Sequence, residues 1–339
     1  MSTTPAARSG GDLILAGDVG GTKTLLGIFD PQPGRPVPLI VRAFVTTTFA
    51  NLTSMVAGFI REHVPPTARI GSAAFGVAGP VLGATAGLTN VPFSIDAVDI
   101  QASVDVARVA LLNDLEAMAY AVPVLAGDEL HVLQAGTPTP AGNMGLIAAG
   151  TGLGESILHR VGGRLVPSPT EAGHADWAPR TPRDIALLQQ IVARHGRAEV
   201  EDVVSGKGFP HLHRATHAAP CTAGIDPDSP AAPALLTAAA LERRCPACVD
   251  ALDMFVEAYG AEAGNLALRA MSTAGLFVGG GIAPKILPAL TDGRFLRAFH
   301  DKGAMRPLVE RMPVHVILNA ESGLLGAAVY AAGSFPANV

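Results

Sequence analysis

The residues best suited to bind a phosphate lie in a glycine-rich segment near the start of the chain. Gly17-Asp-Val-Gly-Gly-Thr-Lys-Thr24 follows a short apolar run, which predicts a turn after a strand. Glycines let backbone N–H groups approach an anion, and threonine and lysine side chains can donate to its oxygens. The candidate phosphate ligands are Gly20, Gly21, Thr22 and Lys23. Asp18 offers a carboxylate for Mg²⁺ and its waters, although an ordinary hairpin turn would fit the same residues, and Walker A spacing is absent.

Two later glycine-rich turns also follow apolar runs. Gly150-Thr-Gly-Leu-Gly154 lies between the runs 144–149 and 155–159, which repeats the strand, turn, strand layout of the first segment. The strand 275–279 ends in consecutive glycines, against which a flat adenine could lie. Each segment alone is equally compatible with a simple turn. The candidate nucleotide ligands here are Gly150, Thr151, Gly152, Gly154, Gly279, Gly280 and Gly281.

Polar side chains suited to chemistry on a sugar occur in two further segments. Asn113 and Asp114 lie where a buried strand is predicted to run into a helix, the position at which open α/β folds place their sites. Asp114 could instead only cap that helix. Glu171 and His174 combine a carboxylate with an imidazole, as recognition of a polyhydroxylated ligand requires, although a core histidine is the alternative.

The cysteines allow two interpretations. Cys245-Pro-Ala-Cys248 has the spacing of a metal-binding pair. The possible further ligands upstream are His211, His213, His217 and Cys221. Because no second CxxC pair is present, we favour two helical cysteines in a protein without a bound structural metal. Three cysteines cannot pair completely, which suits a reducing compartment.

Strands and helices alternate along the chain, as in an α/β protein. The predicted strands are 13–17, 25–29, 39–45, 70–77, 109–113, 144–149, 155–159, 275–279 and 314–318. The predicted helices are 51–64, 114–121 and 323–332, with a helix-rich region over 182–271 interrupted by a loop at 218–233. A length of 339 residues with 49% apolar residues favours two domains, each with its own core.

Charge and hydropathy exclude several classes of protein. A net charge of -5 with no basic stripe argues against a nucleic-acid partner. Pro, Gly or a charged residue interrupts every apolar run before the ~18 residues of a membrane span. The first residues, 1–12, are small and polar and resemble a short loose tail rather than a signal peptide. We therefore expect a cytoplasmic enzyme that does not contact a membrane.

Taken in order, the five segments resemble the bacterial glucokinase family, within the superfamily of sugar kinases, heat-shock proteins and actin. The resemblance runs from about Leu13 to about Tyr330. It implies a two-lobed, actin-like fold of duplicated ribonuclease H-like α/β lobes with a central cleft. The small lobe would be 1–124, completed by the C-terminal helix 319–339, and the large lobe 125–318. No cysteine cluster follows His174, which places the chain in the zinc-free branch.

The resemblance also implies ATP-dependent phosphorylation of glucose at its 6-hydroxyl, in a homodimer. Asp114 would be the general base, Asp18 would orient Mg²⁺ through water, and the three glycine segments would bind ATP. The implied sugar ligands are Asn90, Asn113, Asp114, Glu171, His174 and Glu201. The family commonly has asparagine where Lys23 stands, and a tryptophan where this chain reads Val91-Pro-Phe93.

Two alternatives remain open at this stage. The same chemistry on mannose, fructose or an amino sugar would use the same types of residue. A non-catalytic sugar sensor on a kinase-like fold is less favoured, because the residues before Leu13 are too few for a helix-turn-helix and both aspartates are retained.

Overall fold

The computed structural model describes residues 12–88, 91 and 93–333. The chain divides into two compact units, of which the first comprises Met1–Leu125 with Ala320–Val339 and the second Ala126–Asn319. Asn90, which we expect to contact sugar, lies outside the described residues.

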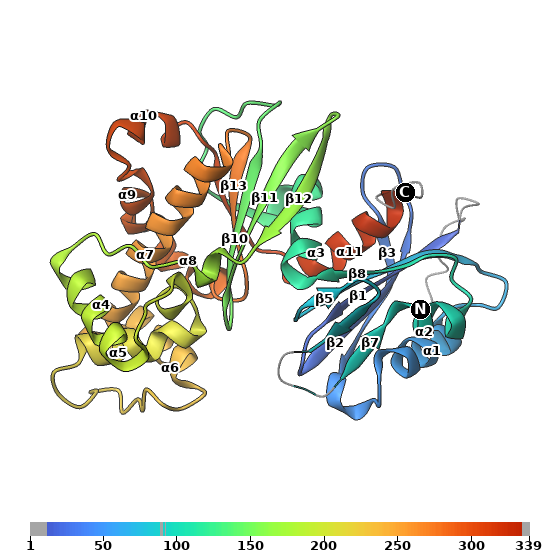
Figure 1. The fold of residues 1–339 in the computed structure, drawn as a ribbon, viewed down its shortest axis with the longest axis horizontal. Helices are drawn as coiled ribbons and strands as arrows, with labels where there is room; N and C mark the ends of the chain where they lie inside the picture. The colour runs from blue at the N-terminus through green and yellow to red at the C-terminus, as the bar shows by residue number, and fades with distance from the viewer. Residues whose placement is uncertain (1–11, 89–90, 92, 334–339) are drawn as a thin grey trace. The chain divides into compact units, whose positions relative to one another are not determined.

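The first unit is built on a mixed sheet in the order β3-β2-β1-β4-β8, beside a small sheet in the order β5-β6-β7 (Figure 1). The strands are β1 (Leu13–Val19), β2 (Lys23–Asp30), β3 (Val37–Val45), β4 (Ile70–Val77), β5 (Val81–Leu82), β6 (Thr85–Gly87), β7 (Ser94–Asp96) and β8 (Val109–Asn113). The helices are α1 (Leu52–His63), α2 (Ala97–Val104), α3 (Asp114–Ala121) and α11 (Ser322–Gly333).

Both faces of this sheet are covered by helices. Because side chains alternate along a strand, neighbouring residues of β1 contribute to two different cores. Leu15 of β1 belongs to a core with Met55 and Phe59 of α1. Ile14, its neighbour in the chain, points to the opposite face and packs with Leu324 of α11. A strand buried on both sides reads as a continuous apolar run, as in the sequence of β1.

The second unit contains a sheet in the order β12-β11-β10-β13-β14-β9. Its strands are β9 (Leu130–Gln134), β10 (Met144–Ala149), β11 (Leu153–Val161), β12 (Arg164–Thr170), β13 (Gly275–Gly279) and β14 (Val314–Ile317). Its helices are α4 (Pro182–His195), α5 (Phe209–Thr216), α6 (Ala232–Leu241), α7 (Pro246–Ala270), α8 (Leu287–Leu290), α9 (Arg294–His300) and α10 (Arg306–Val309).

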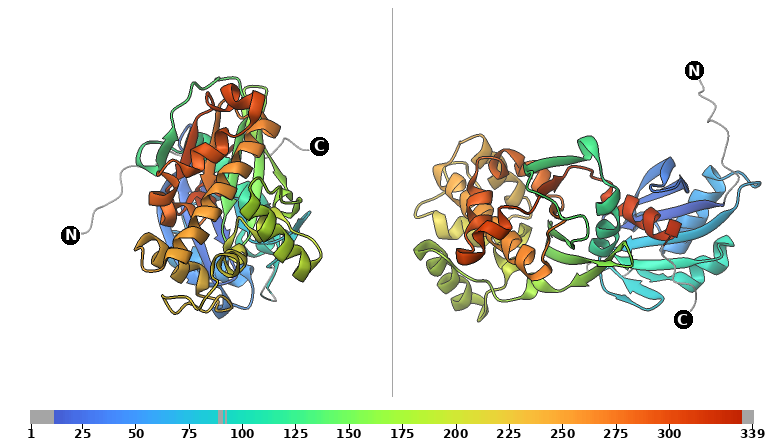
Figure 2. Two further views of the ribbon diagram at one scale, coloured as in Figure 1. Left: turned by 90° about the vertical axis from the view of Figure 1, so that its left-hand side faces the viewer. Right: turned by 90° about the horizontal axis from the view of Figure 1, so that it is seen from above.

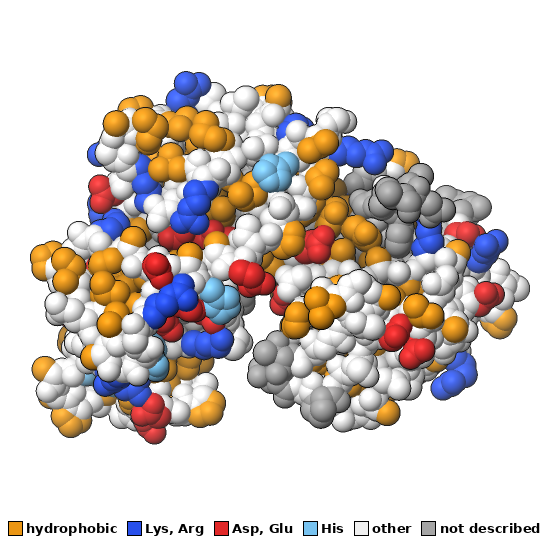
Figure 3. Space-filling model, viewed as in Figure 1, with side chains coloured by type: hydrophobic (Ala, Val, Ile, Leu, Met, Phe, Trp, Pro, Cys, Tyr) orange, Lys and Arg blue, Asp and Glu red, His pale blue; other side chains and the backbone are white. Residues whose placement is uncertain are grey.

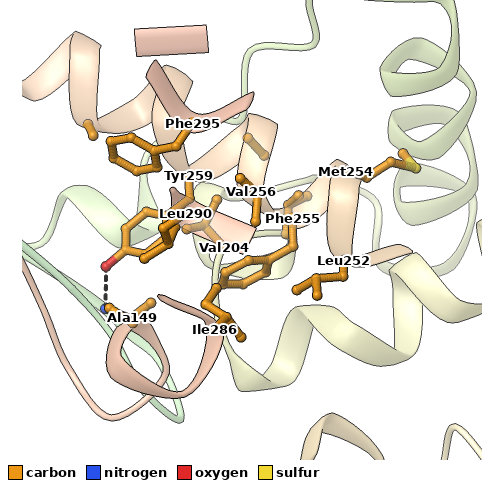
Figure 4. Close-up of a cluster of buried hydrophobic side chains, with 14 of the residues drawn as sticks. Ala149, Val204, Leu252, Met254, Phe255, Val256, Tyr259, Ile286, Leu290 and Phe295 are labelled. Carbon is orange, nitrogen blue, oxygen red and sulfur yellow. Dashed lines mark hydrogen bonds between the residues drawn. The ribbon is translucent and has the colours of Figure 1, made fainter. Parts of the chain in front are cut away.

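The long helix α7 organises the core of the second unit. It packs against β10, and α5, α6 and α9 pack against it (Figures 1 and 2). Tyr259 of α7 is fully buried between Phe255 and Phe295, and its hydroxyl accepts a hydrogen bond from the Ala149 N–H at the end of β10 (Figure 4). The helical core is therefore attached directly to the strand that leads into the second glycine turn.

The two sheets share the layout predicted from the sequence. In the first, β1 pairs with β2 as an antiparallel hairpin and with β4 in parallel. In the second, β10 pairs in the same way with β11 and β13. Both glycine turns, Val19 to Lys23 and Ala149 to Leu153, are the connections of these hairpins. The structure thus confirms the repeated strand, turn, strand arrangement.

Several elements have no counterpart in the sequence prediction. The strands β9 and β12 are the outer strands of the second sheet, and β12 contains Pro167 and Pro169. Proline cannot donate a ladder hydrogen bond and is tolerated at a sheet edge, so its presence hides such a strand from pattern-based prediction. The short strands β5 to β7 and the helix α2 were likewise not predicted.

The surface carries charges of both signs. On the face shown in Figure 3, Lys and Arg side chains are scattered among Asp and Glu side chains. Within the described part of the chain, no helix is both long and apolar enough to span a bilayer.

Candidate functional site

The first glycine turn is held in place by a threonine from the end of β3. The Gly20 N–H donates to the Lys23 carbonyl at 3.1 Å, which closes the turn. The buried Thr46 donates from its backbone to the Thr22 carbonyl at 3.0 Å and from its hydroxyl to the Gly20 carbonyl at 2.6 Å. The sequence analysis missed Thr46, because a threonine 26 residues from Gly20 carries no local sign of this role.

The register of three strands explains why Asp18 and Asp114 interact. Val19 of β1 pairs with Val77 of β4, which in turn pairs with Asn113 of β8, all in parallel. The carboxyl ends of the three strands therefore lie at one edge of the sheet, where open α/β folds place their sites. Asp18 precedes this level by one residue, and Asp114 follows it by one.

Protein surrounds the carboxylate of Asp18. Burial and, after it, the negative charge of Asp114 raise the pKa of Asp18 to about 6, although Lys23 acts in the opposite direction. The helix α11 begins beside it, so that a Cβ on Gly323 would lie 3.1 Å from Asp18 Oδ2. Because residue 323 is glycine, α11 can start next to the Asp18 carboxylate. The charges of Asp18 and Asp114 repel each other, and a divalent cation binds well in such a setting.

Asn113, and not Asp114, is the residue that caps α3. The Asn113 Oδ1 accepts from the Leu115 N–H at 3.0 Å, and its Nδ2 donates to the Gly79 carbonyl at 3.4 Å. Asp114 is the first helical residue, and its Oδ1 also accepts from Leu115 at 2.9 Å. Solvent reaches its carboxylate, yet enough protein surrounds it that desolvation raises the pKa of Asp114, against the hydrogen bond from Leu115.

Glu201 supports the second glycine turn through a hydrogen bond to its backbone. Its Oε2 accepts from the Leu153 N–H at 2.8 Å, and its Oε1 accepts from Lys207 Nζ at 2.7 Å. A Cβ at Gly152 would lie 2.4 Å from Glu201 Oε2, so any side chain there would displace the Glu201 carboxylate. Burial by itself would raise the pKa of Glu201, but the hydrogen bonds from Lys207 and Leu153 outweigh it and the pKa is lowered. Glu201 is thus an ionised partner of the turn.

The second and third glycine segments meet at the ends of β10 and β13. Gly280 has φ +84°, and a Cβ there would lie 2.3 Å from the Ala149 carbonyl oxygen. Tyr259 donates to the carbonyl of Gly279 at 3.2 Å while it accepts from Ala149, which joins the two strand ends. Gly281 faces open space, with no atom within 4 Å of a Cβ built on it. Gly280 is therefore required by packing, and Gly281 is the residue with room beside it.

His174 is paired with a glutamate that the sequence analysis did not identify. Its Nδ1 lies 2.6 Å from Glu199 Oε2, and Arg197 Nη1 donates to Glu199 Oε1 at 3.0 Å. The hydrogen bond to Glu199 raises the pKa of His174, and the charges of Glu201 and Glu171 act in the same direction. The side chain of His174 is 56% exposed, which rules out the core histidine that was the alternative.

The predicted site residues thus form one group in each unit. The first holds Asp18, the turn that follows it, Asn113 and Asp114. The second holds the turn at Gly150 to Gly154, Glu171, His174, Glu201 and the glycines after β13. The first group contains two neighbouring carboxylates and a glycine turn, and the second contains glycine turns and carboxylates, which are the types of residue found where a phosphoryl group is transferred to a hydroxyl.

A comparison with protein-family models identifies the family over nearly the entire chain. The family model described as glucokinase matches residues 15–334. The chain belongs to the glucokinase family. A glucokinase of Nostoc punctiforme is 38% identical over 339 residues, which cover 94% of this chain and 99% of that protein. A glucokinase of Cronobacter sakazakii is 32% identical over 316 residues, which cover 93% of this chain and 96% of that protein.

Solved structures show that this glucokinase-family chain has the actin-like fold with two α/β lobes. A glucokinase from an Antarctic psychrotroph matches with a TM-score of 0.83 at 28% identity and covers 95% of this chain and 99% of its own. A ROK-family glucokinase from Streptomyces griseus, solved with glucose and AMPPNP, matches with a TM-score of 0.63 at 20% identity, covering 94% of this chain and 99% of its own. The predicted fold class is therefore confirmed.

Proposed function

We propose that this protein transfers the γ-phosphoryl group of ATP to the 6-hydroxyl of glucose, with Asp114 as the general base. The observation that carries the proposal is the pair of carboxylates, Asp18 and Asp114, at the carboxyl edge of the first sheet of a glucokinase-family chain. One carboxylate to hold a metal and one to accept a proton are the groups that phosphoryl transfer to an alcohol requires.

Asp114 can accept a proton because the first turn of its helix uses only one of its two carboxylate oxygens, Oδ1. Asn113 caps α3, so the carboxylate of Asp114 keeps an oxygen for a substrate hydroxyl. Desolvation raises the pKa of Asp114, which makes its carboxylate a stronger base. The proton of the 6-hydroxyl passes to Asp114 as the sugar oxygen attacks the γ-phosphorus, and the bond from that phosphorus to the bridging oxygen breaks to release ADP.

Asp18 is the residue suited to hold Mg²⁺, which would arrive with ATP. A half-buried carboxylate whose pKa rises to about 6 beside a second carboxylate gains from a divalent cation that offsets the repulsion. Bound Mg²⁺ would neutralise charge that develops on the phosphate oxygens. The turn from Gly20 to Lys23 would donate to phosphate oxygens, with Lys23 adding a positive charge.

In the second unit we assign recognition of the base, the phosphates and part of the sugar. The turn Gly150 to Gly154 would bind phosphate, and the glycines after β13 would leave room for adenine. Glu171, His174 and Glu201 of this unit would contact hydroxyl groups of the sugar, and Asn90 and Asn113 of the first unit would also do so. Glu201 would do so while it holds the turn, since a carboxylate accepts more than two hydrogen bonds.

A hexose and nucleotide panel tests this proposal. With purified protein, we expect kcat/KM for glucose to exceed that for mannose, fructose and glucosamine, with ATP as phosphoryl donor. A higher kcat/KM for another hexose would reassign the substrate. Glucose binding without any turnover of ATP would replace the enzyme with a sugar sensor.

The resemblance to bacterial glucokinases also leads us to propose a homodimer that acts in the cytoplasm. Light scattering at the assay concentration measures the mass directly. A monomer mass would remove the dimer from the proposal without affecting the chemistry.

A further inference from the structure

Four side chains with metal-binding atoms come together in the helical part of the second unit, on segments that the proposed reaction does not use. His217 directly follows α5, Cys221 lies in the connection to α6, Cys245 is the N-cap of α7 and Cys248 lies in its first turn. The ligand atoms of these four residues all lie within 4.8 Å of one another. Figure 1 shows α5, α6 and α7 packed beside each other in this region.

The distances between these atoms are those of a tetrahedron around zinc. Cys221 Sγ lies 3.8 Å from Cys245 Sγ and 3.7 Å from Cys248 Sγ. His217 Nε2 lies 3.5 Å from Cys245 Sγ and 3.7 Å from Cys248 Sγ. Zn–S bonds of about 2.3 Å and a Zn–N bond of about 2.0 Å give edges of about 3.8 Å between sulfurs and about 3.5 Å between sulfur and nitrogen. A disulfide would instead need sulfurs about 2.05 Å apart.

The imidazole of His217 is oriented as in a metal ligand. Its Nδ1 lies 2.8 Å from the carbonyl oxygen of His213, one helical turn earlier, which accepts the Nδ1 proton. The lone pair is thereby left on Nε2, the atom that faces the two cysteines of α7. A backbone carbonyl that fixes the tautomer of a histidine in this way is the usual partner of a zinc-bound imidazole.

We propose that His217, Cys221, Cys245 and Cys248 bind one zinc ion in a closed structural site. All four coordination positions are filled by protein, which leaves none for a water or substrate, and Cys245 and Cys248 are buried. This proposal replaces the sequence-based interpretation of two helical cysteines without a metal. The ring of His217 stacks on that of His213 at 3.7 Å, and its Nε2 lies beside the thiols of Cys245 and Cys248, which no local spacing in the sequence indicates.

Zinc would add a cross-link between three segments that already pack in one core. It would tie the end of α5 and the Pro-rich connection after it to the start of α7. The helix α5 begins at Phe209, two residues after Lys207, the partner of Glu201. The ion would thus stabilise the helical region and, through α5, the support of the second glycine turn.

Metal analysis of the purified protein tests the proposal. We expect on the order of one zinc ion per chain after purification without chelator, as for a closed four-ligand site. His217→Ala and Cys248→Ser should lose this zinc, whereas His211→Gln, a histidine on α5 outside the cluster, should keep it. Parent protein from zinc-replete cells that carries no zinc, or equal loss in His211→Gln, would overturn the proposal.

A second measurement uses only the parent protein, in case the variants do not fold. Removal of zinc with a chelator and addition of Co²⁺ should produce the thiolate-to-metal charge-transfer bands and the intense visible bands of tetrahedral cobalt. The Tm should fall on chelation and recover with Zn²⁺, because a closed site contributes to folding. A disulfide between any two of the cysteines in freshly purified protein, or octahedral cobalt bands, would contradict the site.

Discussion

Asp18 and Asp114 are neighbours because of strand register and not because of their separation in the sequence. Parallel pairing brings Val19, Val77 and Asn113 to one level, and each aspartate lies one residue from it. The resulting repulsion contributes to the raised pKa of Asp18, after burial. At the residue scale, the central question is whether Asp114 accepts a proton or only supports its helix.

Replacement of Asp114 by asparagine separates these two roles. Asparagine keeps the size of the side chain and an oxygen that accepts from Leu115, but it cannot take a proton. If Asp114 is the general base, kcat should fall by about 10²-fold to 10⁴-fold. Glucose affinity, measured by calorimetry, should change much less.

The matched control is Glu116→Gln, which removes a carboxylate two residues further along α3. It should leave kcat close to that of the parent. An Asp114→Asn protein that melts normally and retains more than about a tenth of the parent kcat would defeat the assignment, since that loss amounts to less than about 1.4 kcal/mol of the activation barrier.

At the scale of elements, the ends of β10 and β13 decide where a nucleotide could lie. Gly280 packs against the Ala149 carbonyl with positive φ, so any side chain there would displace the backbone of β10. Gly281 has neither constraint. Substitutions at the two adjacent glycines therefore separate a loss of thermal stability, expected at Gly280, from a change in the KM for ATP, expected at Gly281.

Gly281→Val should raise the KM for ATP by roughly tenfold or more, while the KM for glucose and the Tm stay near the parent values. The reason is that a branched side chain would fill open space beside the proposed adenine site without a clash in the free protein. Steady-state kinetics with each substrate varied, together with thermal melting, provide the measurement.

Gly280→Ala is the comparison, and it should lower the Tm because its Cβ meets backbone. Equal changes in both KM values for Gly281→Val would show that Gly281 does not adjoin the base.

For the molecule as a whole, the pH dependence of stability is expected to depend on Glu155 in β11, a carboxyl group buried in the second unit. It is fully buried, its Oε1 has no hydrogen-bond partner, and its Oε2 lies 3.5 Å from Arg269 Nη1. Burial, followed by the charge of nearby Glu262, raises the pKa of Glu155 to about 8. The folded protein therefore retains a proton that the unfolded chain releases near the ordinary value of 4.5.

This difference predicts how stability depends on pH. Where the folded state binds more protons, the free energy of unfolding falls as pH rises, so the contribution of protonated Glu155 is complete below about pH 4.5 and lost by about pH 8. Glu155→Gln cannot ionise and should lack this part of the slope. Its stability relative to the parent should increase from about pH 5.5 to about pH 8.5 in urea unfolding.

Glu310→Gln serves as the control, because Glu310 is exposed and paired only with Arg306 at the surface. Its stability relative to the parent should not rise over the same range. Parallel pH profiles for Glu155→Gln and the parent would show that Glu155 is ionised in the folded protein throughout.

Local patterns in the sequence were sufficient for most strands and for the order of motifs. The predicted strands at 13–17, 109–113 and 144–149 fall within β1, β8 and β10, because an apolar run bounded by glycine or a polar turn has few alternatives in a folded protein. The edge strand β12 escaped prediction because it includes two prolines, and β9 because it is a run of five residues interrupted by a histidine. Family and fold class followed from motif order, which survives changes in the residues between motifs.

Only the three-dimensional structure showed which residues contact one another. It assigned the cap of α3 to Asn113, the bracing of the second turn to Glu201, the partner of His174 to Glu199 and the closeness of His217 to three cysteines. A local sequence pattern predicts burial and secondary structure, but it does not predict contacts between distant segments. Contacts between residues such as His217 and Cys248 depend on how α5 and α7 pack, and that is determined by the entire core of the unit rather than by either segment.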